Sequence, residues 1–259
     1  MQLCLDVGNT NIFGGVFDNE KLILRFRHDS TISMTSDQLG IFLRAVLHEN
    51  NIAIAKINKI SIASVVPNLD YLLRSACIKY FKHEPYFLTY QNIKNKIVIA
   101  TDAPHLLGAD IIAGALAAIK AMPDENIIIV DFGTATTICA ITLDKKILGG
   151  VILAGIKLSM LALSENTAKL FPVEIIKPKM VIGTSTEKSI QSGLYYGNIG
   201  MVNEFITRFS QEAFAHKQPK VIATGGFSIL FKEEKIFDAI LPDLVLDGVK
   251  IAADFVAAS

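Results

Sequence analysis

Two stretches of the chain read almost alike: residues 3–12 are LCLDVGNTNI and residues 128–137 are IIVDFGTATT. In each, an apolar run ends beside an aspartate, Asp6 or Asp131, and a glycine-containing polar turn leads to a second apolar run. Charged turns at 18–21 and 144–146 then precede a third run in both copies. Short apolar runs bounded by such turns are typical of strands, so each copy predicts a three-stranded meander.

Helical spacing of apolar residues follows each meander. The predicted helices span residues 36–50, 68–82, 106–121, 157–170, 186–214 and 242–258. Short strands are expected at 60–63 and 220–223. Strands followed by helices, twice over, predict an α/β fold of two similar half-domains, residues 1–123 and 124–259, each a mixed sheet flanked by helices.

Composition limits the classes of function. Of the 259 residues 51% are hydrophobic and 19% charged, which is enough apolar material for a substantial core. The 25 basic and 25 acidic residues cancel, which argues against a nucleic-acid binder that relies on bulk positive charge. No apolar run approaches the roughly 18–20 residues that cross a bilayer, and the first residues do not resemble a signal peptide. We expect a cytoplasmic protein without membrane or nucleic-acid partners, whose three cysteines (Cys4, Cys77 and Cys139) are reduced core residues.

The glycine turns after Asp6 and Asp131 are typical of phosphate binding. Glycine permits positive φ and leaves no Cβ in the way of a ligand. The following N–H groups and the Asn or Thr side chains can then converge on anionic oxygens. The aspartate would repel a phosphate unless it holds a cation, usually through water for Mg²⁺. An ordinary hairpin explains either turn alone, but the repetition favours a nucleotide whose phosphates lie between two half-domains.

A third glycine turn, Thr224-Gly225-Gly226, follows the strand predicted at 220–223. A loop at this position could approach an adenine or a ribose closely. Taken alone, it is better explained as a simple strand-to-helix turn.

An ordered set of motifs runs along nearly the whole chain. The motifs are DVGNTN at 6–11, SVVP at 64–67, GAD at 108–110, DFGTATT at 131–137, GGVI at 149–152, TAKL at 167–170, SIQSGLYYG at 189–197 and ATGG at 223–226. This set resembles the type III pantothenate kinases of the acetate kinase/sugar kinase/heat-shock-protein-70/actin superfamily. The resemblance implies actin-like (ribonuclease H-like) half-domains, a homodimer, and ATP-dependent phosphorylation of pantothenate to 4′-phosphopantothenate, the first step towards coenzyme A.

The resemblance also implies roles for individual residues. The implied ATP-binding residues are Asp6, Val7, Gly8, Asn9, Thr10, Asn11, Ile12, Phe13 and Thr134. The implied pantothenate-site positions are Thr101, Gly108, Ala109, Asp110, Ile111 and Thr186. Asp131 would lie at a monovalent cation, K⁺ or NH₄⁺, and Asp6 at Mg²⁺ through water. Asp110 would be the catalytic base, and its place at the start of a helix predicts that the helix dipole keeps it ionised.

Departures from the family pattern cluster on the acceptor side. The family has an arginine that binds the pantothenate carboxylate where this chain has Ile111, an aromatic residue where it has Thr101, and Pro-Gly where it has Ala154-Gly155. Three explanations stay open. Another cation (Lys94, Lys96 or His105) replaces the arginine, the acceptor is a different alcohol, or the chain is a nucleotide-binding regulatory protein.

Overall fold

The computed structural model describes residues 1–30, 33–215 and 217–257. Residues 256 and 257 are described by their backbone alone. The chain forms two compact units, described separately below. Unit 1 comprises residues 1–97, 102–117 and 244–259, and unit 2 comprises residues 98–101 and 118–243. These units differ from half-domains divided at 123/124 chiefly because the last helix belongs with unit 1.

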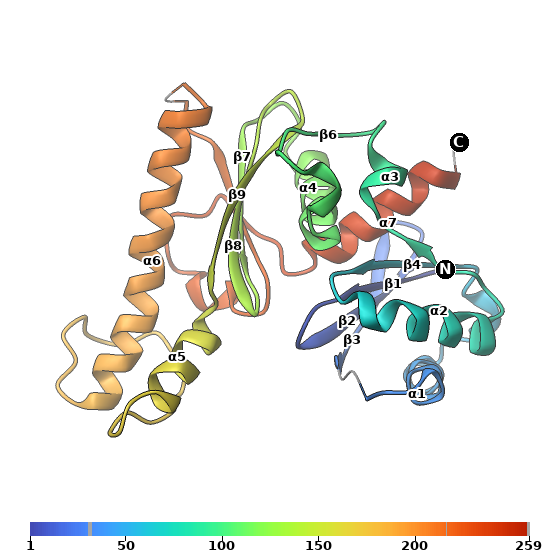
Figure 1. Cartoon of the computed structure of the whole chain (residues 1–259), viewed down its shortest axis with the longest axis horizontal. Coiled ribbons are helices and arrows are strands. Elements are labelled where there is room, and N and C mark those ends of the chain that lie inside the picture. Colours follow the sequence, from blue (N-terminus) through green and yellow to red (C-terminus); the bar gives the residue numbers. More distant parts are fainter. Residues whose placement is uncertain (31–32, 216, 258–259) are drawn as a thin grey trace. The chain divides into compact units, whose positions relative to one another are not determined.

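Unit 1 contains a five-stranded mixed sheet in the order β3-β2-β1-β4-β5 (Figure 1). The strands are β1 Gln2–Val7, β2 Asn11–Asp18, β3 Lys21–Asp29, β4 Lys59–Ser64 and β5 Tyr86–Phe87. The first three form the predicted antiparallel meander, and β4 runs parallel to β1.

Helices cover both faces of this sheet. They are α1 Ser36–Glu49, α2 Pro67–Phe81, α3 Tyr90–Ile93, the first part of α4 Ala109–Ala121, and α7 Leu244–Ala257, with 3₁₀ turns η1 Ile54–Lys56 and η2 Pro104–Leu106. The core on the α1 and α2 face contains Leu5 of β1, Leu43 of α1 and Leu73 of α2, each at most 1% exposed. Full burial stabilises the fold by about 1.5–3 kcal/mol per such side chain.

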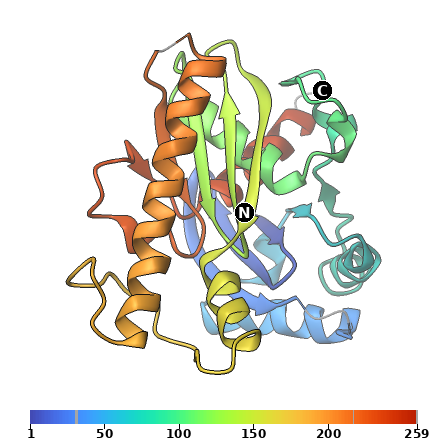
Figure 2. The ribbon, with the colours of Figure 1, turned by 60° about the vertical axis from the view of Figure 1, so that its left-hand side comes forward.

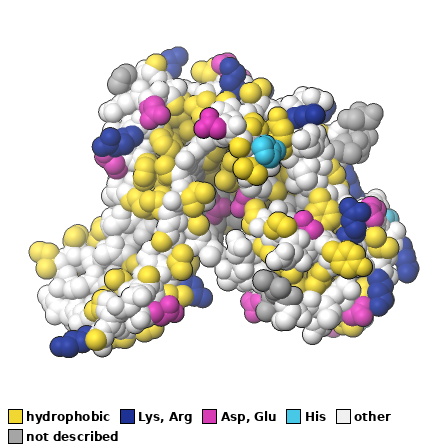
Figure 3. Space-filling model, in the orientation of Figure 1, with side chains coloured by type: hydrophobic (Ala, Val, Ile, Leu, Met, Phe, Trp, Pro, Cys, Tyr) yellow, Lys and Arg dark blue, Asp and Glu magenta, His cyan; other side chains and the backbone are white. Residues whose placement is uncertain are grey.

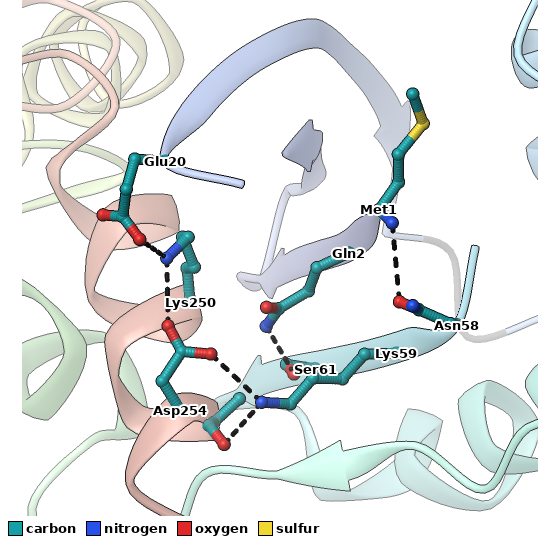
Figure 4. Close-up of polar contacts among 9 residues, drawn as sticks. Met1, Gln2, Glu20, Asn58, Lys59, Ser61, Lys250 and Asp254 are labelled. Atoms are coloured by element: carbon teal, nitrogen blue, oxygen red, sulfur yellow. Dashed lines mark hydrogen bonds and ion pairs between the residues drawn. The ribbon is translucent and has the colours of Figure 1, made fainter. Parts of the chain in front are cut away.

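Polar contacts fasten α7 to the sheet (Figure 4). The nearly buried ammonium of Lys250 donates to Glu20, in the turn between β2 and β3, and to Asp254 one helical turn on. Lys59 of β4 donates to the other Asp254 oxygen at 3.2 Å and to the Ala253 carbonyl at 2.6 Å. Burial lowers the pKa of Lys250, but its two carboxylate partners more than offset this, so the pKa lies above its ordinary value. The C-terminal helix is therefore an integral part of unit 1.

Unit 2 repeats the meander in a six-stranded sheet of order β11-β10-β7-β8-β9-β6. Its strands are β6 Val98–Ile99, β7 Ile127–Phe132, β8 Ala135–Ile141, β9 Lys146–Ala154, β10 Lys220–Thr224 and β11 Ala239–Ile240. The strands β7, β8 and β9 are antiparallel, whereas β10 runs parallel to β7. Two mixed sheets, each opening with a meander and flanked by helices, confirm the predicted fold class.

One face of the unit 2 sheet is covered by α5 Ile156–Glu165 and the long helix α6 Thr186–Ala213, with η3 Ser228–Phe231 beside them (Figure 2). Their shared core includes Phe132 of β7, Ile138 of β8, Tyr195 of α6 and Phe231 of η3. Tyr195 is 1% exposed, and its hydroxyl donates to Glu234 at 2.7 Å, which satisfies the polar end of a buried ring.

The predicted helices are present, and three of their ends are shifted by two or more residues. The helix predicted at 157–170 ends at Glu165, because the Asn166 and Thr167 side chains donate hydrogen bonds to the carbonyls of Ala162 and Leu163 in its last turn. The helix predicted from 106 begins at Ala109, after the separate turn η2 and the extended Leu107. The last helix begins at Leu244 rather than at 242, and the predicted end at Ala258 lies outside the described residues.

Candidate active site

The first glycine turn joins β1 to β2. Val7 pairs with Ile12, and the Gly8 N–H donates to the Asn11 carbonyl at 3.0 Å. A Cβ at Gly8 would meet only that carbonyl oxygen, at 3.4 Å, so the space outside the turn is open. Asp6 lies on β1 directly opposite Phe13 of β2.

Neighbouring strands support this turn on both sides. The Ser30 N–H, just after β3, donates to the Thr10 carbonyl at 2.9 Å. The Val65 N–H, just after β4, donates to the Val7 carbonyl at 3.0 Å. The turn is therefore held by backbone bonds, while the side chains of Asn9 and Thr10 are exposed.

The second glycine turn is one residue shorter than the first. Phe132 pairs with Thr136, which leaves three residues, 133–135, where the first turn has four, 8–11. Thr136 rather than Thr137 thus corresponds to Ile12, which corrects the alignment of the repeat after the glycine. Both side chains are fully buried, consistent with this equivalence.

The start of α5 packs closely against the second turn. A Cβ at Gly155, the residue before α5, would lie 2.2 Å from the Thr134 carbonyl oxygen and 2.6 Å from that of Gly133. Only glycine fits here without a backbone shift. The glycine of Ala154-Gly155 therefore matters for the turn, although the proline that usually precedes it is absent.

The third glycine turn lies against Asp131. Thr224 of β10 is the parallel neighbour of Asp131 on β7, so both side chains lie on the same face of the sheet. Gly225 has φ +86, and a Cβ there would lie 2.3 Å from Asp131 Oδ1. Thr224 is 1% exposed, and its Oγ1 has no hydrogen-bond partner within the described part of the chain. Thr224-Gly225-Gly226 thus borders the carboxylate of the second turn and leads into η3.

Gly225→Ala is expected to destabilise the protein by about 2–3 kcal/mol, because a positive φ and a collision with Asp131 add together. Gly226→Ala is the matched control, since nothing lies within 4 Å of its Cβ position. Thermal unfolding of both variants measures the difference. Equal unfolding temperatures would show that the backbone at 225 can relax.

Asp110 lies in the first turn of α4. Its Oδ1 accepts a hydrogen bond from the Ile111 N–H at 2.7 Å. A Cβ at Gly108 would lie 2.4 Å from the same oxygen and 3.5 Å from Val65 Cγ1. Because the Val65 N–H binds the Val7 carbonyl, Gly108 and Asp110 lie at the edge of the sheet that carries the first glycine turn.

The environment of Asp110 differs from the sequence expectation. Burial raises the pKa of this carboxyl above its ordinary value of 3.8, and the backbone N–H groups of Ile111 and Asp110, which lower it, offset only part of the effect. Burial therefore works against the helix start at this carboxyl, and the ionised state expected for Asp110 stays a prediction. A carboxylate with a raised pKa accepts a proton more readily, as a general base must.

The other acceptor-side residues fall in both units. Ile111 follows Asp110 in unit 1 and is partly buried. Thr101 belongs to unit 2, where its methyl group is 3.5 Å from the Cβ position of Gly149 and its buried Oγ1 lacks a hydrogen-bond partner among described residues. Thr186, exposed, is the first residue of α6, after the N-cap Ser185, whose side chain accepts from the Lys188 N–H at 3.3 Å.

Two of the three cations considered as substitutes for an arginine at 111 have other contacts. Lys94 donates to Gln91 at 3.2 Å, and the Lys96 ammonium lies 5.6 Å from the centre of the Phe255 ring. His105 is exposed in η2, three residues before Gly108. It is the candidate nearest in sequence to the acceptor-side residues.

Among the described residues, no group of three or more His, Cys, Asp or Glu side chains is arranged to hold a metal ion. None of the helices described is both long and apolar enough to cross a membrane.

Comparison with known proteins identifies the family. A family model for type III pantothenate kinase matches residues 2–208. The chain belongs to the type III pantothenate kinase family. It is 54% identical to a type III pantothenate kinase of Legionella pneumophila (strain Paris) over 253 residues, 98% of each chain. It is 46% identical to one from Elusimicrobium minutum (strain Pei191) over 254 residues, again 98% of each chain.

Two solved structures share the fold of this chain. A Campylobacter jejuni protein, described provisionally as a Baf family transcriptional activator, aligns with a TM-score of 0.63 at 20% identity over 99% of this chain and all of its own. A Sinorhizobium meliloti protein, described provisionally as a 2-dehydro-3-deoxygalactonokinase, aligns with a TM-score of 0.60 at 11% identity over 99% of this chain and 97% of its own. At these identities the likeness concerns the fold alone.

Proposed function

We propose that this family member transfers the terminal phosphoryl group of ATP to pantothenate, giving ADP and 4′-phosphopantothenate. Near full-length identity of 54% to a type III pantothenate kinase is the observation that carries the proposal. Ile111 and Thr101 alone do not favour a regulatory protein or a different alcohol, because the match to the family extends along the chain on both sides of these positions.

Positioning of the nucleotide is assigned to the paired turns. Asp6 to Phe13 and Thr134 would bind the ATP phosphates through backbone N–H groups and short polar side chains. Phosphoryl transfer depends mostly on such positioning and on stabilisation of charge. The open space at Gly8 and the exposed Thr134 support this assignment.

Asp110 is assigned the role of base. The pantothenate hydroxyl oxygen forms the new bond to the terminal phosphorus, the bond from that phosphorus to the bridging oxygen of ADP breaks, and the hydroxyl proton passes to Asp110. The raised pKa of Asp110 and its place beside Gly108 support this role. Gly108, Ala109, Thr101 and Thr186 would line the acceptor site.

Two carboxylates are assigned to the cations of the family, Asp6 to Mg²⁺ and Asp131 to a monovalent cation. Asp6 would hold Mg²⁺ through water, and Mg²⁺ with ATP neutralises charge on the phosphates. Asp131 would hold K⁺ or NH₄⁺. The unpartnered, buried hydroxyl of Thr224 beside Asp131 is the kind of oxygen that a monovalent cation needs.

A homodimer is proposed from the surface of unit 2. Hydrophobic side chains are visible on the surface of this part of the chain (Figure 3). On α5 and the segment after it, the exposed fractions are 48% for Leu158, 49% for Phe171, 72% for Met180 and 81% for Ile182. Large apolar surfaces that stay exposed in a single chain are often covered by a partner, here a second copy of the chain. Light scattering should give twice the 28.2 kDa mass of one chain. A mass equal to one chain at micromolar concentration would contradict the dimer.

A cytoplasmic location completes the proposal. All three cysteines are buried and unpaired. Burial raises the pKa of the Cys77 and Cys139 thiols to about 12, so neither is a ready thiolate. Such cysteines suit a reducing compartment.

Ile111→Arg is expected to lower the KM for pantothenate by roughly tenfold or more, because a guanidinium can pair with the pantothenate carboxylate in bidentate fashion. Ile111→Met, similar in size but without charge, is the control. Steady-state kinetics and calorimetry with pantothenate measure the effect. If Arg and Met behave alike, the carboxylate is bound elsewhere, and His105→Ala then tests the remaining candidate.

A further inference from the structure

Arg27 lies in the same cross-strand row of the unit 1 sheet as Asp6. The register pairs Asp6 of β1 with Phe13 of β2, and Phe13 with Arg27 of β3. Residues directly opposite one another on neighbouring strands project from the same face. Arg27 thus lies on the face that carries the Asp6 carboxylate, with its Cα roughly 10 Å from that of Asp6 at the usual strand spacing.

The side chain of Arg27 reaches back across the sheet. Its guanidinium carbon lies 4.2 Å from the centre of the Phe13 ring. Because Phe13 stands between Arg27 and Asp6, this places the guanidinium towards Asp6, two residues before Gly8, and away from the sheet edge. Stacking on an aromatic face leaves the N–H groups of a guanidinium available to an anion.

Ordinary surface pairing does not account for this arrangement. Asp29 follows two residues later on the same exposed face of β3, and its main chain pairs with Asn11. Yet Arg27 makes no ion pair with Asp29 or with any other residue that the structure describes. Arg27 is exposed, is stacked on the Phe13 ring and makes no ion pair with Asp29. Its guanidinium is therefore suited to bind an anionic ligand.

We propose that Arg27 binds the terminal phosphate of ATP at the first glycine turn, with Phe13 as the platform that orients its guanidinium. The proposal rests on the proposed function, since it concerns the nucleotide of the same site. Arg27 would neutralise charge on the oxygens of the phosphoryl group that is transferred, while Asp110 takes the proton of the acceptor.

Calorimetry with a non-hydrolysable ATP analogue and, separately, with ADP tests the proposal in the presence of Mg²⁺. Arg27→Gln is expected to weaken binding of the analogue by roughly 10–100-fold, as for loss of a charged hydrogen bond, and to change ADP binding by less than about threefold. The affinity of Arg27→Lys for the analogue should lie between those of the unmodified protein and Arg27→Gln, because lysine keeps the charge but not the planar group.

Arg25→Gln is the matched control. Arg25 has the same side chain on the same strand and face, one row further from the turn, opposite Gly15. The Arg25→Gln substitution should change the affinity for the ATP analogue and for ADP by less than about threefold. Thermal unfolding of each variant checks that the fold is retained.

The binding comparison and the turnover assay test the role of Arg27 and the proposed function separately. Analogue affinity of Arg27→Gln within threefold of the unmodified protein would overturn the proposal, and equal losses for analogue and ADP would overturn the assignment to the terminal phosphate. Absence of pantothenate turnover in the unmodified protein would instead refute the proposed function, while the binding comparison would still decide the role of Arg27.

Discussion

Asp110→Asn is expected to lower pantothenate-dependent ADP formation by roughly 10²–10⁴-fold while binding of an ATP analogue persists. Asparagine keeps the size of the side chain but cannot take the proton of the hydroxyl. The fall should appear in kcat, because the lost interaction belongs to the transition state. Turnover within tenfold of the unmodified enzyme would remove Asp110 from the mechanism.

The pH dependence of this reaction follows from the same carboxyl. Because burial raises the pKa of Asp110, the acid limb of kcat/KM should lie above the ordinary carboxyl value of 3.8. Between the unfolded and folded pKa values the folded state binds more protons, so this group contributes less stability as pH rises through that window. Asp110→Asn removes the buried charge, and its unfolding temperature near neutral pH should equal or exceed that of the unmodified protein. A clearly lower temperature would mean that the Ile111 N–H bond outweighs burial.

Gly248→Ala is expected to destabilise the protein by about 3 kcal/mol or more. A Cβ at Gly248 of α7 would lie 1.8 Å from the Ala113 carbonyl oxygen and 2.3 Å from its carbon, so the two helix backbones of unit 1 would have to separate. Overpacking against a backbone has no flexible side chain that can give way. Because α4 also carries Asp110 in its first turn, lost stability should be accompanied by lost turnover.

A glycine of α6 is the control for this substitution. Nothing lies within 4 Å of the Cβ position at Gly200, so Gly200→Ala should stabilise the protein by about 0.5–1 kcal/mol through helix propensity alone. Denaturant unfolding of both variants measures the contrast. If Gly248→Ala is as stable as the unmodified protein, α4 and α7 do not cross at this glycine.

Features set by local pattern were predictable from the sequence. Asp6 and Asp131 each end an apolar run before a glycine, and both meanders follow from that repeat. Helical periodicity placed α1, α2 and α6 to within a residue at each end. The family, and with it the fold, followed from the order of the motifs along the chain.

Features set by tertiary packing were not predictable. Periodicity shows that 244–257 is a helix, but not that Lys250 and Asp254 fasten it to the first sheet. The missing residue in the second turn is visible only in the pairing of Phe132 with Thr136. The raised pKa of Asp110 depends on what buries it, and the position of Arg27 over Phe13 depends on strand register. In β3, exposed and partly buried residues alternate along the strand, and this alternation was the sequence signal that could have placed Arg27 on the exposed face.

Product analysis of the unmodified protein tests the central claim most directly. The protein is incubated with ATP, Mg²⁺, K⁺ and pantothenate, and mass spectrometry quantifies 4′-phosphopantothenate beside ADP. One 4′-phosphopantothenate should form for each ADP, and neither should accumulate when pantothenate is omitted. Binding of the ATP analogue without any 4′-phosphopantothenate at high enzyme concentration would contradict the assignment of this chain as a pantothenate kinase.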